Sequence, residues 1–117
     1  MNLSEKEIVD INTKFGYELI NPSNLNFAYD LAKYNAKTKL REMAIMFRGI
    51  ALGHPFSNGN KRTAGIVLLK ILEEMKADKE ITSYNKSKLK TYLFSAIKNN
   101  TSNLNSLERG FSRCVEK

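Results

Sequence analysis

The sequence predicts an all-α fold, a compact bundle of about six helices around a central helix at residues 62–76. Two observations lead to this prediction. Apolar residues recur at three- and four-residue spacing in successive segments, and no segment sustains the two-residue alternation of a half-buried strand. The central segment is apolar around most of its circumference, which is typical of a helix in the middle of a bundle.

Local signals set the expected ends of the first two helices. Ser4 and Glu7 form a capping box at the start of the first helix, and Gly16 ends it. Ser23 follows a proline and is placed to cap the second helix, whose apolar residues run through 25–34.

Periodicity predicts the other helices in the same way. The third helix carries apolar residues over 40–51 and stops at Gly53. The fifth covers 89–97 and the sixth 104–115, with Gly110 as a weak point inside it. The connector after the central helix leaves room for a short extended piece at 81–82.

Length and composition restrict the class of protein. A chain of 117 residues with 42% hydrophobic residues predicts one domain, 1–117, that can bury a core without metal or disulfide. No apolar run is long enough to cross a membrane, and Met1 does not lead into a signal peptide. The one cysteine, Cys114, is expected to be a structural thiol in a reducing compartment, so we expect a cytoplasmic protein.

The charge predicts an acidic partner. A net charge of +7 favours nucleotide phosphates, nucleic acid or an acidic protein. Lys and Arg are spread along the chain, whereas a nucleic-acid-binding arm concentrates them. Nucleic acid is therefore the least favoured of these partners, and a solvated basic surface is the simpler alternative.

Polar residues are concentrated in one loop between two apolar helices. It holds the only histidine, His54, and ends in Gly59, Asn60, Lys61 and Arg62 just before the central helix. The first N–H groups of a helix lack partners and lie at the positive end of its dipole. With a flexible glycine and two cations, this arrangement is typical of an anion site and suits a polyphosphate.

His54 adds a group able to move a proton. Histidine changes charge near neutral pH, so it can accept a proton from an attacking hydroxyl. The alternatives are structural: His54 can end the preceding helix, and Asn58 and Asn60 can cap the next one. Lys61 and Arg62 oppose the helix dipole unless an anion is bound, which favours a functional site. We expect Phe56 to anchor the loop in the core.

The string His-Pro-Phe-Ser-Asn-Gly-Asn-Lys-Arg at 54–62 resembles the Fic/Doc signature, H-x-F-x-[DE]-[GA]-N-[GK]-R. It departs from that signature at Asn58, where the family has a carboxylate that holds Mg²⁺. The resemblance implies a compact helical enzyme that takes a nucleoside triphosphate, ATP above all, and modifies a protein hydroxyl.

The resemblance also assigns roles to residues. His54 would be the general base and Lys61 the second catalytic residue, while Gly59, Asn60, Lys61 and Arg62 would bind the phosphates. Phe56 would be structural. Asn58 would be a weak metal ligand, because a neutral amide offers Mg²⁺ one oxygen without the charge.

Lys61 is similar to the Doc (death-on-curing) branch, whereas adenylylating Fic enzymes usually carry glycine there. Gly65, where many of those enzymes have a second arginine, points the same way. The implied function is a toxin that phosphorylates a hydroxyl on a translation elongation factor. No inhibitory [ST]-x-x-x-E-[GN] motif fits the sequence, so a separate antitoxin protein is the expected partner.

Three alternatives and one smaller expectation remain. The protein could transfer AMP to a protein hydroxyl, it could be a metal-impaired pseudoenzyme that acts as a binding module, or it could bind nucleic acid through its charge. A flap that aligns the target commonly precedes the motif helix in this family, and segment 34–39 is the candidate for it.

Overall fold

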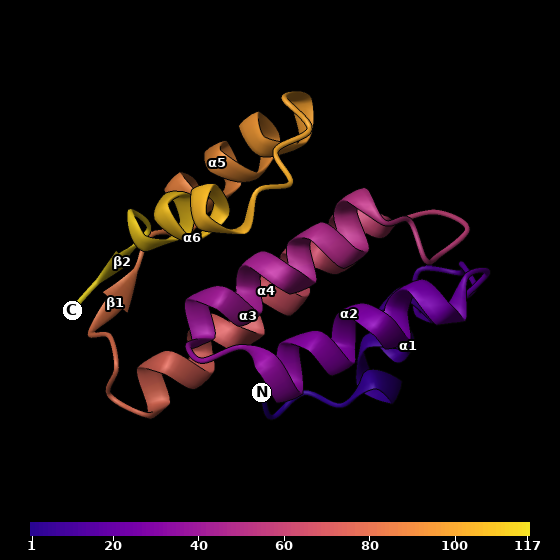
Figure 1. Ribbon diagram of the computed structural model, residues 1–117, viewed down its shortest axis with the longest axis horizontal. Coiled ribbons are helices and arrows are strands. Elements are labelled where there is room, and N and C mark those ends of the chain that lie inside the picture. The colour runs from indigo at the N-terminus through magenta and orange to yellow at the C-terminus, as the bar shows by residue number, and fades with distance from the viewer.

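A computed structural model describes all 117 residues and confirms the all-α prediction (Figure 1). The elements, in chain order, are α1 (Glu5–Thr13), α2 (Pro22–Asn35), α3 (Lys39–Phe47), the π-helical turn η1 (Arg48–Leu52), α4 (Asn60–Ala77), β1 (Ser83–Tyr84), α5 (Lys86–Lys98), α6 (Leu104–Ser112) and β2 (Val115–Glu116). None of the helices is both long and apolar enough to cross a membrane.

Helices α3 and α4 form the middle of the molecule. Figure 1 shows α1 and α2 on one side of this pair and α5 and α6 on the other. Helix α3 contacts α2, α4 and α6, while α4 contacts α1 and η1. One cluster of 25 buried residues joins these layers, and the inward faces of α3 and α4 supply much of it. The loop between η1 and α4 is therefore held at both ends by the rod that begins with α3 and by α4, the two most buried helices.

The central helix begins earlier than predicted. It covers Asn60–Ala77 rather than 62–76, because Gly59 occupies the N-cap position in a left-handed conformation with φ 72°. Asn60 is therefore the first residue of the helix. With this start, Lys61 joins Arg62 in the first turn, where backbone N–H groups have no partner inside the helix.

The capping predictions for the first two helices had different outcomes. The capping box of Ser4 and Glu7 is confirmed at the start of α1. The prediction that Ser23 caps the second helix was wrong, because Asn21 occupies that position and Pro22 is the first helical residue. Proline has a fixed φ and no N–H to satisfy, so it suits the first helical position.

The third predicted helix is divided in two. Regular α-helix ends at Phe47, and the π-helical turn η1 continues to Leu52. At this turn the backbone approaches α2 closely, since a Cβ on Gly49 would lie 2.2 Å from the Cβ of Ala28. Single π turns inside helices often occur at functional sites. This one sets the direction in which the chain leaves toward His54.

The C-terminal region holds the only sheet. Helix α6 ends at Ser112 rather than near 115, and β2 pairs antiparallel with β1. The predicted extended piece therefore lies at 83–84 rather than 81–82. Gly110 is not a weak point of α6, because the ring of Tyr92 fills the space where a Cβ would be, with its Cζ at 1.9 Å.

Candidate active site

The loop before α4 is held by an extended segment that follows α1. Leu19 forms an antiparallel bridge with Phe56. Beside this bridge the Ser57 N–H donates to the Glu18 carbonyl at 2.8 Å, and the Glu18 N–H donates to Ser57 Oγ at 3.1 Å. The Phe56 side chain is 1% exposed and lies in the core. The loop is therefore held by hydrogen bonds to the extended segment and by the burial of Phe56.

Asn60 shapes the loop from within. Its Oδ1 accepts a hydrogen bond from the Phe56 N–H and its Nδ2 donates to the Phe56 carbonyl, both at 3.0 Å. The residue is 7% exposed. The side chain is thus occupied by the protein's own backbone, which leaves the Asn60 backbone N–H as the group that can meet a ligand.

Asn12, a residue that sequence reasoning missed, supports the loop from α1. It is fully buried, and its Nδ2 donates to the Asn58 carbonyl at 2.9 Å and to Thr63 Oγ1 at 3.0 Å. A signal for it exists in the sequence: Asn12 lies four residues after Ile8, on the buried side of α1, where an apolar residue is expected. A buried side-chain amide at such a position is expected to form hydrogen bonds within the protein.

Gly59 is required by both conformation and space. Its φ of 72° lies in the left-handed region, which glycine adopts without a steric penalty. A Cβ there would lie 2.8 Å from Cδ2 of Tyr17. Tyr17, which the sequence reasoning also missed, covers the loop at this point.

The N-terminus of α4 presents free backbone donors. Thr63, the fourth residue of the helix, is the first whose N–H is bonded, to the Gly59 carbonyl at 2.9 Å. The N–H groups of Asn60, Lys61 and Arg62 have no acceptor within the protein. Because Gly59 has no side chain to cap them, these donors can bind an anion.

His54 and these donors share one cleft. It has a volume of about 390 Å³ and is lined by Tyr17, His54, Ser57, Asn58, Gly59, Asn60, Lys61 and Arg62. His54 is exposed and has a φ of 50°, which is unusual for a residue other than glycine. Such conformations persist where the surrounding structure imposes them, and they cluster at active sites.

The cleft carries positive charge without a compensating acid. Neither Lys61 nor Arg62 forms an ion pair, and no carboxylate lines the cleft. The Arg62 guanidinium lies over the ring of Phe15, 4.9 Å from its centroid. This stacking holds Arg62 at the edge of the cleft without neutralising it. Two full charges and the helix dipole therefore favour an anionic ligand.

The comparisons with known proteins agree with this geometry. The sequence model of the Fic/DOC family matches residues 3–72, which include α1, the His54 loop and most of α4. The chain belongs to the Fic/DOC family. Searches of curated proteins and of solved structures found no match. Fic/DOC enzymes transfer nucleotide-derived groups to proteins, so membership indicates a protein-modifying function of this general type.

Asn58 of this Fic/DOC protein does not fit a metal held by the protein. Its Oδ1 accepts a 2.7 Å hydrogen bond from the Gly59 N–H. No group of three or more His, Cys, Asp or Glu side chains is arranged to hold a metal ion. Mg²⁺ prefers charged oxygen ligands. The side-chain amide oxygens that line the cleft, those of Asn58 and Asn60, are neutral and already accept hydrogen bonds.

The candidate flap of this Fic/DOC protein does not lie beside the motif. Segment 34–39 joins α2 to α3, whereas the His54 loop follows the opposite end of the α3–η1 rod (Figure 1). The rod has 14 residues from Lys39 to Leu52 and is about 20 Å long. That prediction was wrong because the sequence order of segments did not reveal which one lies along the loop. Segment 17–21 does so instead.

Proposed function

We propose that this Fic/DOC protein binds a nucleoside triphosphate, ATP above all, and transfers its γ-phosphate to a protein hydroxyl. The observation that carries the proposal is the shared cleft, in which an exposed histidine lies with three free amides and two unpaired cations. A polyphosphate needs the amides and cations, and a hydroxyl acceptor needs the histidine.

In the proposed complex the phosphates lie against the N-terminus of α4. The free N–H groups of Asn60, Lys61 and Arg62 donate to phosphate oxygens, and the Arg62 guanidinium can hold two of them at once. Lys61 supplies a compact charge to the phosphate that is transferred. Asn12 and the Asn60 side chain keep the loop in shape rather than touching the ligand.

His54 would act on the acceptor. Its imidazole takes the proton of the target hydroxyl while the hydroxyl oxygen attacks the γ-phosphorus. The bond between the γ-phosphorus and the β,γ-bridging oxygen breaks, and the nucleoside diphosphate leaves. A base placed in this way contributes about a hundred- to ten-thousand-fold in rate.

A second groove offers space for the nucleoside. It lies between α4 and α5, has a volume of about 300 Å³ and starts at Arg62, which also lines the cleft. Gly65, Ile66 and Leu69 line it from α4 and Leu89 and Leu93 from α5. A Cβ added to Gly65 would meet nothing within 4 Å. Lys86 and Lys90 complete its lining. A mainly apolar groove that shares Arg62 with the cleft supports a nucleotide rather than a simple phosphate.

The proposal includes the role of a toxin. Lys61 is similar to the Doc branch and Gly65 points away from AMP transfer, so we infer phosphate transfer onto a translation elongation factor and neutralisation by a separate antitoxin protein. The unpaired cations of the cleft suit an acidic segment of such an antitoxin.

The test determines which phosphate of the nucleotide is transferred. The protein is incubated with a translation elongation factor and with ATP labelled at either the α- or the γ-phosphate, beside a His54→Ala control. We expect label to move from the γ position only, and the control to lose at least a hundredfold in rate. Movement of the α label instead would establish AMP transfer and overturn the kinase assignment.

The second candidate function is that of a binding module without catalysis. Asn58 favours it, because a neutral amide stands where the family has a carboxylate. In that case the protein binds ATP but modifies nothing. Asn58→Asp supplies a carboxylate that can hold Mg²⁺. If only Asn58→Asp transfers phosphate, the natural protein is the binding module. Equal rates in both proteins would exclude that alternative.

A further inference from the structure

Helix α2 exposes large aromatic side chains to solvent. Phe27 and Tyr34 are each 70% exposed. Leu31, which is half-buried, lies between them, so the three residues follow the i, i+4, i+7 spacing of one helical face. Exposed apolar surface of this extent, arranged in a stripe, is typical of an interaction site.

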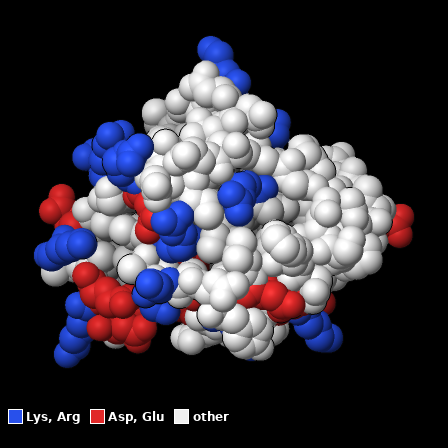
Figure 2. Space-filling model, in the orientation of Figure 1, with Lys and Arg blue, Asp and Glu red and all other residues white.

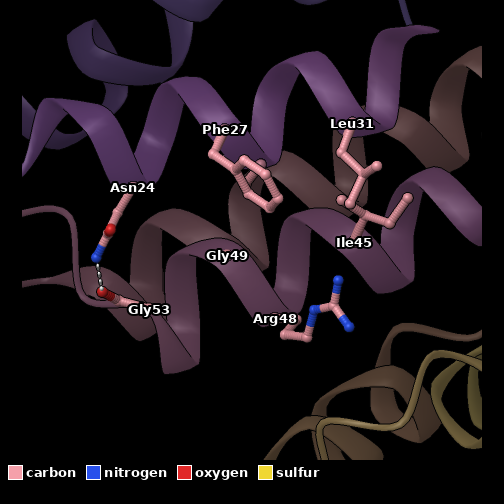
Figure 3. A pocket seen from close by; sticks show the side chains of 8 residues that line it. Asn24, Phe27, Leu31, Ile45, Arg48, Gly49 and Gly53 are labelled. Carbon is pink, nitrogen blue, oxygen red and sulfur yellow. Dashed lines mark hydrogen bonds between the residues drawn. The ribbon is translucent and has the colours of Figure 1, made fainter. Parts of the chain in front are cut away.

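The stripe borders a groove between α2 and the α3–η1 rod. Figure 3 shows Phe27 and Leu31 along one wall and Ile45 and Arg48 along the other. Gly49 lies in the groove, where contact of the backbone with α2 brings the two walls together. This part of the groove has a volume of about 280 Å³. We call the whole groove, of which this hollow is one part, the α2–α3 groove.

The groove continues toward the start of α3. A second hollow of about 440 Å³ shares Leu31 and Ile45 with the first and reaches Lys37 and Thr38. Together they follow α2, whose 14 residues span about 21 Å. That length accommodates about four turns of a third helix.

Two cations along the α2–α3 groove, Arg48 and Lys37, are unpaired. Arg48 is half-buried and Lys37 is exposed, and neither forms an ion pair or a side-chain hydrogen bond. The acid in the second hollow, Glu108, is bound by Arg41 at 3.1 Å. Figure 3 shows the Arg48 guanidinium beside the groove, below Ile45.

We propose that the α2–α3 groove binds an amphipathic helix of another protein, with an apolar ridge that meets Phe27 and Leu31 and acidic residues that meet Arg48 and Lys37. A groove between two helices accepts a third by packing of ridges into grooves. Apolar anchors at helical spacing are typical of helix-in-groove recognition. Acidic flanks give the occupant a partner for each unpaired cation.

The charge argues against other occupants. A second copy of this chain would also carry +7, so two copies would repel each other through their net charge. Nucleic acid would need a row of cations, whereas Figure 2 shows Lys and Arg scattered over this face and few charged residues on its right-hand part. The apolar lining fits a protein helix better than either.

The proposal goes beyond the function of the His54 cleft and does not depend on it. The two places are nevertheless neighbours, because Asn24 and Gly53 line one end of the α2–α3 groove and Asn24 Nδ2 donates to the Gly53 carbonyl at 3.1 Å. His54 is the next residue. A helix in the groove therefore contacts the chain where it enters the cleft.

The test uses three synthetic helical peptides of 18 residues. One carries Leu at i, i+3, i+4 and i+7 with Glu beside this ridge, the second has Lys for Glu, and the third has Ser for Leu. Binding is measured by fluorescence anisotropy with the whole protein. We expect the Glu peptide alone to bind. Phe27→Ser should weaken its binding about tenfold or more, since buried aromatic anchors dominate such interfaces.

Two further variants separate the possible outcomes. Arg48→Glu should weaken the Glu peptide and allow the Lys peptide to bind, which loss of fold would not produce. Phe94→Ser, which removes an aromatic residue that is 65% exposed on α5, should change nothing. Equal binding of all three peptides, or equal loss in the Phe27 and Phe94 variants, would overturn the proposal. So would self-association, or binding to anionic lipid vesicles, that depends on Phe27 in place of peptide binding.

Discussion

Asn12 connects three parts of the site through one side chain. It reaches from α1 to the carbonyl of Asn58 in the loop and to the hydroxyl of Thr63 in α4. Because Asn12 and Thr63 are fully buried, water cannot replace these bonds. Asn12 therefore acts as a positioning residue for the amides that precede and begin α4.

We predict that Asn12→Ala lowers both the free energy of unfolding and the affinity of the loop for an anion. The lost donor leaves the Thr63 hydroxyl without its partner, so we expect about 1–3 kcal/mol less stability in urea unfolding. Binding of tripolyphosphate, measured by calorimetry in conditions where the variant is folded, should weaken about tenfold. Thr13→Ala, an exposed neighbour on α1, is the control and should change neither quantity much. Wild-type affinity in a folded Asn12→Ala variant would remove Asn12 from the site.

Cys114 is predicted to be an inert thiol. It is 3% exposed, its Sγ lies 3.6 Å from the Gly110 carbonyl, and burial raises the pKa of the thiol. DTNB at pH 8 should therefore react slowly with the native protein and completely in denaturant. Because the pKa is higher in the folded state, the thiol's contribution to stability is present below the unfolded value and is lost as pH rises through the folded one. Immediate reaction of the native protein would show that the packing around α6 opens.

At the scale of single elements, two glycines of the α4 region have opposite roles. Gly65 lies inside α4, where a Cβ meets nothing within 4 Å. Gly59 has a φ of 72° and lies against Tyr17. Gly65→Ala should stabilise the protein by about 0.5–1 kcal/mol, since alanine loses less entropy in a helix. Gly59→Ala should destabilise it by about 1 kcal/mol or more.

Thermal unfolding of the two variants tests both predicted changes in stability, the gain for Gly65→Ala and the loss for Gly59→Ala. Neither change alters charge, so a difference between them reports backbone conformation and space alone. If Gly65→Ala lowers the melting temperature, the groove between α4 and α5 is narrower than the structure shows. If Gly59→Ala is neutral, the loop does not need the left-handed residue.

The same elements show what sequence can predict. The six α-helices were predictable because each buries an apolar stripe of helical period. The π-helical turn was not, because it depends on the close approach of Gly49 to Ala28, two positions that no local pattern connects. The start of α2 was misplaced because Ser23 was given more weight than Pro22. Segment 17–21 was missed because its partners in the loop are 34 or more positions away in the sequence.

The site was predictable where it is continuous in sequence. Residues 54–62 lie together because they are one loop and one helical turn. Asn12 and Tyr17 come from a different helix and its following turn, so only the packing of α1 against α4 brings them there. A polar residue at a core position of α1 was the one available sign.

For the whole molecule, the net charge of +7 matters less than where charge is left unpaired. Most cations lie on a solvated surface, where salt screens them beyond roughly 8–10 Å. Lys61 lies within the cleft beside free amides, and no carboxylate lines that cleft. Lys76, near the other end of α4, lies 15 residues away, about 22 Å along the helix. The two lysines carry the same charge in different surroundings.

We predict that tripolyphosphate detects this difference. Lys61→Gln should weaken its binding about three- to tenfold at low salt, since two unit charges about 4 Å apart in water attract by about 1 kcal/mol. Lys76→Gln removes the same charge beyond the screening length and should leave affinity within twofold at 0.15 M salt. The dependence of affinity on salt concentration should also be shallower for Lys61→Gln than for wild type. Equal losses in the two variants would mean that the anion follows overall charge, and the N-terminus of α4 would then not be its site.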